Sequence, residues 1–235
     1  MTYSRLRALA LGTVMLCAGC AQTVNGDPRS IAAADGAAPA VAPADLGTLL
    51  LSDAEMSDAI AVPGLVSHDP YQELTPPQGE SYSDPSCAGA LFNTMYTAYD
   101  GIDYTGMVGR KVGAPGDEWG LTDTDQGVVS FRSADEASRY VVRTQLDWDR
   151  CSDKRVSVSE NKDDKLPQTY TVGFPTVTDE IPTLLISPEA GDGYLCERAI
   201  ASRSNVVIDV YVCADDVKAE QAVAVVNSIA NKMPH

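Results

Sequence analysis

The chain has 235 residues and a formal net charge of −16, because 33 acidic residues outnumber 17 basic ones. A surface this negative repels nucleic acid and anionic lipid headgroups, so we expect no nucleic-acid partner. Two histidines are present, His68 and the terminal His235, which argues against histidine-based catalysis and a histidine-rich metal site.

Residues 1–20 predict a signal peptide of the lipoprotein kind. Two arginines precede an apolar run, residues 8–16, that is too short to span a bilayer as a helix. The tripeptide Ala18-Gly19-Cys20 then resembles a lipobox, in which the cysteine after the cleavage site carries a diacylglycerol. We therefore expect lipidation at Cys20 and anchoring at the extracytoplasmic face of the cell membrane. Cys17 stands where a lipobox usually has leucine, which leaves an ordinary secretory signal as the alternative.

The next segment, residues 21–45, is rich in Ala, Pro and Gly and has almost no large apolar residue. Such a composition cannot bury enough apolar surface to fold, so we expect a disordered tether. Residues 46–235 are long enough to form one domain with a substantial core.

Four helices are expected in this domain. Their predicted starts are Ser52 and Ser133, each opening a capping box, Asp84-Pro85, and Asp215 or Asp216. The helix from Asp84 should end at Gly101. On the helix from Ser133, apolar residues recur at helical spacing as far as Trp148.

Alternating polar and apolar residues predict short strands between these helices. The expected ranges are 104–111, 126–132, 155–159, 168–175, 183–187 and a hairpin at 193–213. Turn residues separate neighbouring strands, so adjacent strands should pair antiparallel. The expected fold class is therefore α+β, an antiparallel β-sheet flanked by helices.

The hairpin at residues 193–213 is the most informative part of the sequence. With Ser204-Asn205 as its loop, and Asn205 supplying the left-handed residue, Cys196 falls opposite Cys213. A cross-strand disulfide requires this placement. One face of the hairpin then carries apolar core residues: Ala199, Ala201, Ile208, Val210 and Val212. The other face carries a set that is unusual for a core: Cys196, Arg198, Asp209, Tyr211 and Cys213.

Four cysteines remain when the two in the signal segment are set aside, an even number in an exported chain. Two disulfides account for them, with three possible pairings. The hairpin register favours Cys196–Cys213, which leaves Cys87–Cys151 as the second bridge. A zinc site of all four cysteines is the rival hypothesis, but it lacks any C-x-x-C pair.

Other catalytic and metal motifs are weak. Asp123-x-Asp125-x-Gly127 resembles part of an EF-hand loop, but the glycine comes one position early and the final glutamate is absent. The sequence has no G-x-S-x-G motif and no histidine partner for its serines, so a serine hydrolase is not expected. We therefore expect no metal and no cofactor.

Three motifs follow one another along the chain: Ser133–Ala137 leading to Gln145–Cys151, then Cys196–Ala199, then Asn205–Val210 with Cys213. Together they resemble the extracellular sensor domain of the PknH-like family, over about residues 46–233. The resemblance implies an antiparallel sheet flanked by helices, two disulfides and a cleft that binds a ligand. In this family the domain also occurs alone on actinobacterial lipoproteins, which agrees with the signal segment and tether.

The function that these features favour is a lipid-anchored extracytoplasmic binding or sensor domain that catalyses no reaction. Its ligand would be a small polar molecule or an envelope polymer, bound on the hairpin face that carries Arg198, Asp209 and Tyr211. Trp148 and Gln145 would lie at the edge of this site. We expect the membrane to be contacted through the lipid anchor alone.

Alternatives exist for the site residues and for the function of the whole protein. Arg198 and Asp209 could form a plain surface ion pair of little energetic value, and Trp148 could simply pack its helix against the sheet. For the whole protein, the alternatives are an envelope protein–protein interaction module and a hydrolase that uses carboxylates only.

Overall fold

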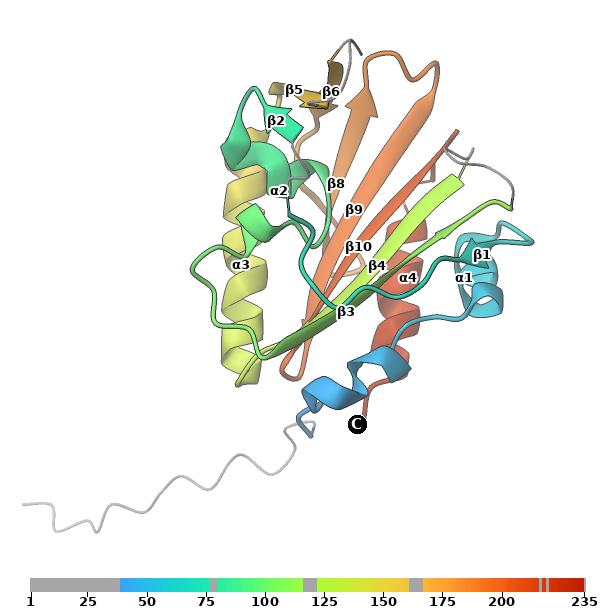
Figure 1. Ribbon diagram of the computed structural model, residues 1–235, viewed down its shortest axis with the longest axis vertical. Coiled ribbons are helices and arrows are strands. Elements are labelled where there is room, and N and C mark those ends of the chain that lie inside the picture. Colours follow the sequence, from blue (N-terminus) through green and yellow to red (C-terminus); the bar gives the residue numbers. More distant parts are fainter. Residues whose placement is uncertain are drawn as a thin grey trace, which may run out of the picture. The chain divides into compact units, whose positions relative to one another are not determined.

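A β-sheet extends through the folded part of the chain and carries helices on both faces (Figure 1). This computed structural model describes residues 39–76, 80–115, 122–160, 167–215, 217–218 and 220–234, and the structural statements below concern these residues. The predicted signal peptide, Cys20 and most of the predicted tether lie outside them.

The described strands form one ten-stranded sheet in the order β1-β3-β4-β10-β9-β8-β6-β5-β2, with β7 paired to β8. Their bounds are β1 Val66–Ser67, β2 Glu80–Tyr82, β3 Gly106–Gly113, β4 Thr122–Ser130, β5 Arg155–Glu160, β6 Gln168–Val172, β7 Thr176–Thr178, β8 Ile181–Pro188, β9 Tyr194–Arg203 and β10 Val206–Asp215. Every ladder between these strands is antiparallel. The predicted fold class is confirmed.

Helices of two kinds accompany the sheet. The α-helices of the described residues are α1 Asp53–Ile60, α2 Ala88–Leu91, α3 Ala134–Cys151 and α4 Gln221–Asn231, and the 3-10 helices are η1 Pro43–Thr48, η2 Pro85–Cys87 and η3 Tyr96–Ala98. None of them is long and apolar enough to cross a membrane.

The two predicted capping boxes start helices as expected. Ser52 and Glu55 satisfy each other's main-chain N–H groups at the start of α1. Ser133 likewise accepts a hydrogen bond from the Glu136 N–H at the start of α3. The carboxylate of Glu136, however, accepts from the N–H of Arg132 rather than from that of Ser133, so the second box is only half formed.

Two helix predictions are wrong. No continuous helix runs from Asp84 to Gly101, because the segment consists of η2, the single turn α2, and η3, and Thr94 has a φ of 48°. The last helix does not begin near Asp215, because β10 continues through that residue and α4 starts at Gln221.

The hairpin of β9 and β10 has the predicted register. Cys196 lies opposite Cys213, and a disulfide joins them at a Cα–Cα distance of 4.0 Å, so this pairing is confirmed. The turn differs in one detail, since Ser204 rather than Asn205 adopts the left-handed conformation, with a φ of 49°.

Asn205 instead uses its buried side chain to fix the start of the domain. Its Nδ2 donates to the carbonyl oxygens of Val41 and Phe131, and its Oδ1 accepts from the N–H of Val41. Val41 is buried, and η1 begins two residues later. Residues 39–45, which composition assigned to the tether, are therefore part of the described fold.

Two hydrophobic cores lie on opposite faces of the sheet. The first packs α1, α4 and η1 against the hairpin face that was predicted as core. The second packs α3 and residues 85–102 against the other hairpin face. The hairpin face on which the sequence analysis placed the ligand is therefore not open in this structure, because both faces of the sheet are covered.

Candidate functional site: a buried charged cluster

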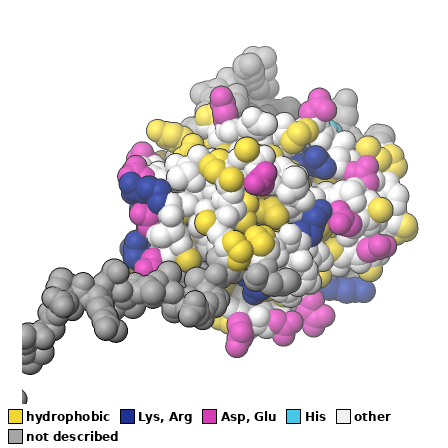
Figure 2. All heavy atoms as spheres, turned by 90° about the horizontal axis from the view of Figure 1, so that it is seen from below, with side chains coloured by type: hydrophobic (Ala, Val, Ile, Leu, Met, Phe, Trp, Pro, Cys, Tyr) yellow, Lys and Arg dark blue, Asp and Glu magenta, His cyan; other side chains and the backbone are white. Residues whose placement is uncertain are grey.

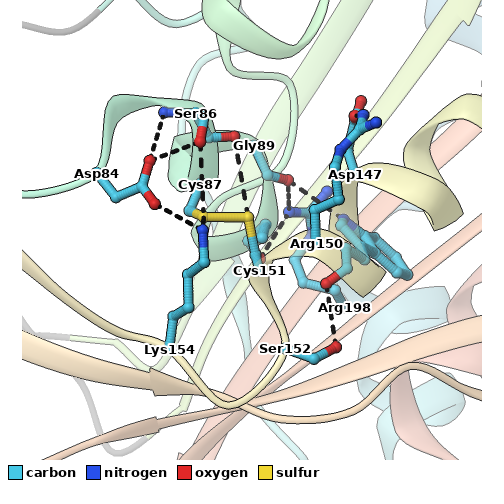
Figure 3. The surroundings of a disulfide bond; sticks show 12 residues. Asp84, Ser86, Cys87, Gly89, Asp147, Arg150, Cys151, Ser152, Lys154 and Arg198 are labelled. Carbon is cyan, nitrogen blue, oxygen red and sulfur yellow. Dashed lines mark hydrogen bonds and ion pairs between the residues drawn. A yellow bond between two sulfur atoms is a disulfide. The ribbon is translucent and has the colours of Figure 1, made fainter.

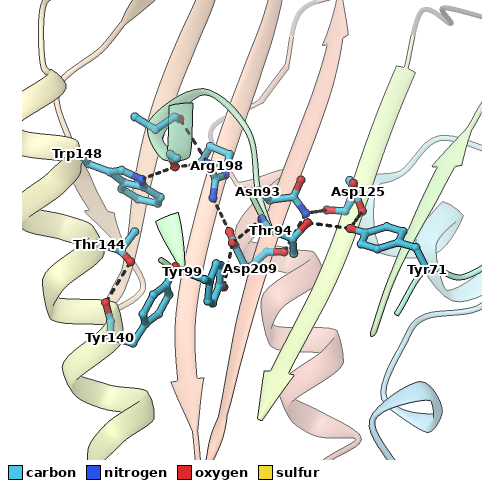
Figure 4. A network of polar contacts seen from close by, with 12 residues as sticks. Tyr71, Asn93, Thr94, Tyr99, Asp125, Tyr140, Thr144, Trp148, Arg198 and Asp209 are labelled. Atoms are coloured by element: carbon cyan, nitrogen blue, oxygen red, sulfur yellow. Dashed lines mark hydrogen bonds and ion pairs between the residues drawn. The ribbon is translucent and has the colours of Figure 1, made fainter. Parts of the chain in front are cut away.

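Residues 85–102, which we call the covering segment, lie over the second hairpin face between α3 and β4 (Figure 4). The segment begins at the disulfide Cys87–Cys151, which joins it to the end of α3 at a Cα–Cα distance of 5.7 Å (Figure 3). Lys154 pairs with Asp84 at 2.8 Å next to this bridge. The predicted pairing of these two cysteines is confirmed.

Arg198 of β9 holds the first part of the covering segment. Its Nη1 donates to the main-chain carbonyl of Gly89 at 2.8 Å and to that of Ala90 at 3.4 Å. Its Nη2 donates to Oδ1 of Asp209 at 2.5 Å, an ion pair between two buried side chains. The guanidinium carbon lies 5.4 Å from the centre of the Trp148 ring, which adds a cation–π interaction (Figure 4).

Asp209 of β10 holds the second part of the segment. Its Oδ2 accepts from the N–H of Thr94 at 2.9 Å and from the Tyr99 hydroxyl at 3.3 Å. The amide of Asn93 donates to the main-chain carbonyls of Asp209 and Asp125, at 3.3 Å each. These bonds to the sheet explain why α2 ends before Asn93. In a continuing helix the Asn93 amide and the Thr94 N–H would point away from the sheet.

Asp125 of β4 is a second buried carboxylate. Together with Arg198 and Asp209 it forms the group that we call the charged cluster. It accepts from the Tyr71 hydroxyl at 2.7 Å, and the same hydroxyl lies 3.0 Å from Oγ1 of Thr94. Burial raises the pKa of Asp125 to about 6, because the loss of water outweighs the hydrogen bond from Tyr71. Two glycines make room, since a Cβ at Gly109 would lie 2.1 Å from the Tyr71 ring and one at Gly127 would lie 2.2 Å from Thr94.

The charged cluster is closed in this structure. The exposed fractions of Arg198, Asp209 and Trp148 are 1%, 2% and 0%. Removing one partner of such a buried pair leaves an uncompensated charge and costs about 3–5 kcal/mol. One donor, the Nε of Arg198, has no acceptor among the described residues. The Nε–H of Arg198 thus remains without a hydrogen bond while the cluster holds the covering segment.

The structure brings three of the five predicted ligand-binding residues into direct contact: Arg198, Asp209 and Trp148. Trp148 also packs α3 against the sheet, as the alternative hypothesis had it. Tyr211 lies beside Arg198 across the ladder, and its hydroxyl donates to a sulfur of the hairpin disulfide at 2.9 Å. Gln145 is half-buried on α3 and makes no hydrogen bond with the described residues of the cluster.

The main partners that the sequence analysis missed are in the covering segment. Asn93, Thr94 and Tyr99 were assigned to a helix and given no role. The pair Asn93-Thr94 was the available indication, because both residue types favour turns over helix interiors.

The described residues contain no group of three His, Cys, Asp or Glu side chains that could hold a metal ion. Asp123 and Asp125, which resembled part of a calcium loop, lie in the ladder between β4 and β10.

Comparison with known proteins supplies the family. The model of the PknH-like extracellular domain matches residues 41–232. Over 177 residues the chain is 32% identical to the serine/threonine-protein kinase PknH of Mycobacterium tuberculosis, covering 74% of this chain and 27% of that protein. It is 26% identical to the kinase PknJ of the same organism over 183 residues, covering 77% of this chain and 31% of that protein.

The chain therefore spans less than a third of the length of these curated relatives. Among solved structures, the extracellular domain of PknH from Mycobacterium tuberculosis superimposes with a TM-score of 0.75 at 27% identity. That match covers 83% of this chain and 97% of the other. The matched region is the extracellular one and leaves the kinase part uncovered. This chain belongs to the PknH-like extracellular domain family.

Proposed function

We propose that this protein is a lipid-anchored domain at the extracytoplasmic face of the membrane, where it binds a small polar ligand or an envelope polymer end without catalysing a reaction. It is an extracellular sensor-type domain like that of PknH. The lipobox-like tripeptide ending at Cys20 supports the anchor. The charged cluster supports the binding role.

One observation carries the binding role: the cluster holds the covering segment by main-chain groups. Arg198 binds carbonyl oxygens, and Asp209 binds an N–H. A polar ligand that offers a carbonyl or hydroxyl oxygen and a donor presents the same chemistry. Because the Nε of Arg198 is also unused, such a ligand can make at least one bond more than the segment does.

Access requires movement of the covering segment, since the ligand has to replace its contacts. In this proposal Arg198 and Asp209 exchange main-chain partners for ligand atoms. Tyr211 and Trp148 then form aromatic walls, and Gln145 contacts the ligand from α3. The displaced segment stays attached through the Cys87–Cys151 disulfide at its start.

The test has two stages. First, the purified domain is screened against polar envelope metabolites by thermal shift, because a ligand bound by the native state raises its stability. Second, hydrogen exchange is measured for the Thr94 N–H with and without each hit. We expect a true ligand to raise the melting temperature and yet to speed exchange at Thr94. Stabilisation with unchanged or slower exchange at Thr94 would place the ligand elsewhere and contradict the displacement.

A matched pair of variants separates the site from general effects. Tyr211→Phe keeps the ring and removes the hydroxyl, and it should weaken binding of the hit. Tyr82→Phe is the control, since the Tyr82 hydroxyl donates to Glu80 outside the cluster. Equal affinities in both variants would exclude the Tyr211 hydroxyl from the site.

A second candidate function, an interaction module for another envelope protein, has one observation in its favour. Val142 and Leu146 lie one turn apart on α3 and are 54% and 56% exposed. Exposed apolar groups that gather on one surface are typical of contact sites. The double change Val142→Ser with Leu146→Ser should abolish a specific cross-link between this protein and an envelope protein in isolated membranes. Val177→Ser, a change at an exposed valine of β7, should retain the cross-link.

A further inference from the structure

A surface hollow of about 270 Å³ lies where α3 begins, outside the charged cluster. The loop at residues 101–103 forms one side and the first turns of α3 form the other. Its apolar lining consists of Ile102, Phe131 and Tyr140. Its charged lining consists of three arginines and two acidic residues: Arg132, Arg139, Arg143, Asp103 and Glu136. Figure 2 shows this end of the molecule, with basic and acidic side chains interspersed along the side that α3 forms.

The arginines differ in how far they are neutralised. Arg132 lies 3.2 Å from Asp103 and 3.3 Å from Glu136, so two carboxylates more than neutralise its charge within the hollow. Arg143 reaches Asp147 only at 3.8 Å, and Arg139 makes no ion pair with a described residue.

Arg139 and Arg143 are also four residues apart on α3, where like charges destabilise a helix by a few tenths of a kcal/mol. Both line the hollow on a chain whose net charge is −16. An anion between the two guanidinium groups would remove this repulsion. Guanidinium groups suit phosphate and carboxylate because their parallel N–H groups match two oxygens of one anion.

The floor of the hollow is aromatic. Phe131 and Tyr140 are buried beneath it, with ring centres 5.6 Å apart. Tyr140 stacks in turn on Tyr99, at 4.4 Å between ring centres. A floor of this kind favours a flat apolar group over a hydrated inorganic ion.

We propose that this hollow binds a small anion, a phosphate or a carboxylate, that is carried on a single flat apolar group. Arg139 and Arg143 pair with the anion, and Phe131, Tyr140 and Ile102 contact the flat group. The volume is slightly below the range of about 300–1,000 Å³ usual for drug-sized ligands, which limits the ligand to about one ring. The two arginines lie outside the charged cluster, although the hollow shares Ile102 with the covering segment, and Tyr140 of the hollow stacks on Tyr99 of that segment.

The experiment is a titration of the isotope-labelled domain with phenyl phosphate, followed by amide chemical shifts. We expect saturable shifts at Ile102, Arg139 and Tyr140. Benzoate tests the carboxylate form, and inorganic phosphate and phenol test the charge and the ring alone. Phenyl phosphate or benzoate should bind about tenfold more tightly than either fragment, which corresponds to about 1.4 kcal/mol.

The variants Arg139→Gln and Arg143→Gln should each weaken binding about tenfold, and both side chains are exposed, so folding should be unaffected. The matched control is Arg150→Gln, an exposed arginine on the same helix that does not line the hollow. Its affinity should equal that of the wild type.

Four results would overturn the proposal. The first is no saturable shift with either aromatic anion. The second is an equal loss of affinity in Arg150→Gln, which would indicate diffuse surface charge. The third is binding of inorganic phosphate as tight as that of phenyl phosphate, which would indicate an adventitious ion only. Shifts confined to Thr94 and its neighbours would locate the ligand in the charged cluster and would also contradict this site.

Discussion

Glu197 of β9 is a buried carboxylate outside the charged cluster. Its Oε2 accepts a hydrogen bond from the N–H of Ala222 at the start of α4, at 3.0 Å. The pKa of Glu197 is nevertheless raised to about 7, because burial and, to a smaller degree, the charge of Glu220 outweigh the lowering by the bond from Ala222. The side chain therefore fixes α4 to the sheet but is destabilised when ionised.

Glu197→Gln should change how stability depends on pH. The pKa of Glu197 is raised from about 4.5 in the unfolded chain to about 7 in the fold, so protonated Glu197 stabilises the fold at low pH. This stabilisation is lost as the pH rises from about 4.5 through about 7. The variant keeps an acceptor for Ala222 and should be more stable than wild type at pH 8 by up to about 3 kcal/mol. Urea unfolding between pH 4 and 8 measures this.

The control for this prediction is Glu73→Gln, the same substitution at an exposed position, where the gain in stability at pH 8 should be absent. Some slope should persist in Glu197→Gln below pH 6, since burial also raises the pKa of Asp125. If the free energy of unfolding of the wild type does not fall between pH 5 and 8, the raised pKa of Glu197 is contradicted.

Gly127 of β4 is a residue at which a single methyl group decides the packing. A Cβ there would lie 2.2 Å from Cγ2 of Thr94 and 3.3 Å from the carbonyl oxygen of Asp209. Gly127→Ala should therefore displace the covering segment and destabilise the domain by about 1–3 kcal/mol. Adding Thr94→Ser removes the clashing methyl and should restore part of the loss, as a double-mutant cycle in urea would measure. Gly47→Ala, where a Cβ meets nothing within 4 Å, is the control.

The covering segment is the element on which the site depends. It contains little regular structure. Arg198 donates to its main chain, Asp209 accepts from its main chain, and a disulfide holds its start. Leu91 and Tyr99 of the segment are also buried in the second core. Movement of the segment in the proposed binding event therefore exposes apolar surface as well as breaking these bonds, and the ligand has to offset both losses.

Cys87→Ser with Cys151→Ser tests the disulfide at the start of this element. The bridge spans 64 residues of sequence, for which the chain-entropy model gives about 4 kcal/mol, against about 3 kcal/mol for the hairpin bridge, which spans 17. We expect removal of the first bridge to speed exchange of the Thr94 N–H, and removal of the second to leave it slow. Unfolding in urea and hydrogen exchange measure the two effects. The opposite pattern of exchange would show that the segment is not anchored through Cys151.

At the scale of the whole molecule, we predict that a lipid at Cys20 anchors the protein to the membrane. The tripeptide ending at Cys20 predicts a diacyl anchor, and the net charge of −16 disfavours binding of the protein surface to anionic lipid. Cys20→Ala should therefore release the domain from the membrane fraction or leave the precursor uncleaved. Fractionation with mass determination of the N-terminus measures this, and Cys17→Ala is the matched control. Unchanged partitioning and processing in Cys20→Ala would refute the anchor.

The sequence by itself determined the features that depend on neighbours along the chain. Alternation and a short loop predicted the β9–β10 register, and this register brought Cys196 opposite Cys213 and Arg198 diagonal to Asp209. Capping boxes predicted the starts of α1 and α3. These features could be predicted because each depends on local hydrogen bonds and on the fixed period of a strand or a helix.

The tertiary structure alone decided what covers the second hairpin face. Asn93 and Thr94 leave the helical conformation because Asp209, more than a hundred residues away, offers them better hydrogen bonds than another helical turn would. Asn205 likewise turns its side chain to Val41 instead of supplying the left-handed residue of its loop. Such partners come together only when the sheet has formed, so no local pattern contains them. The charged face on which the sequence predicted a ligand site is for this reason buried within a core.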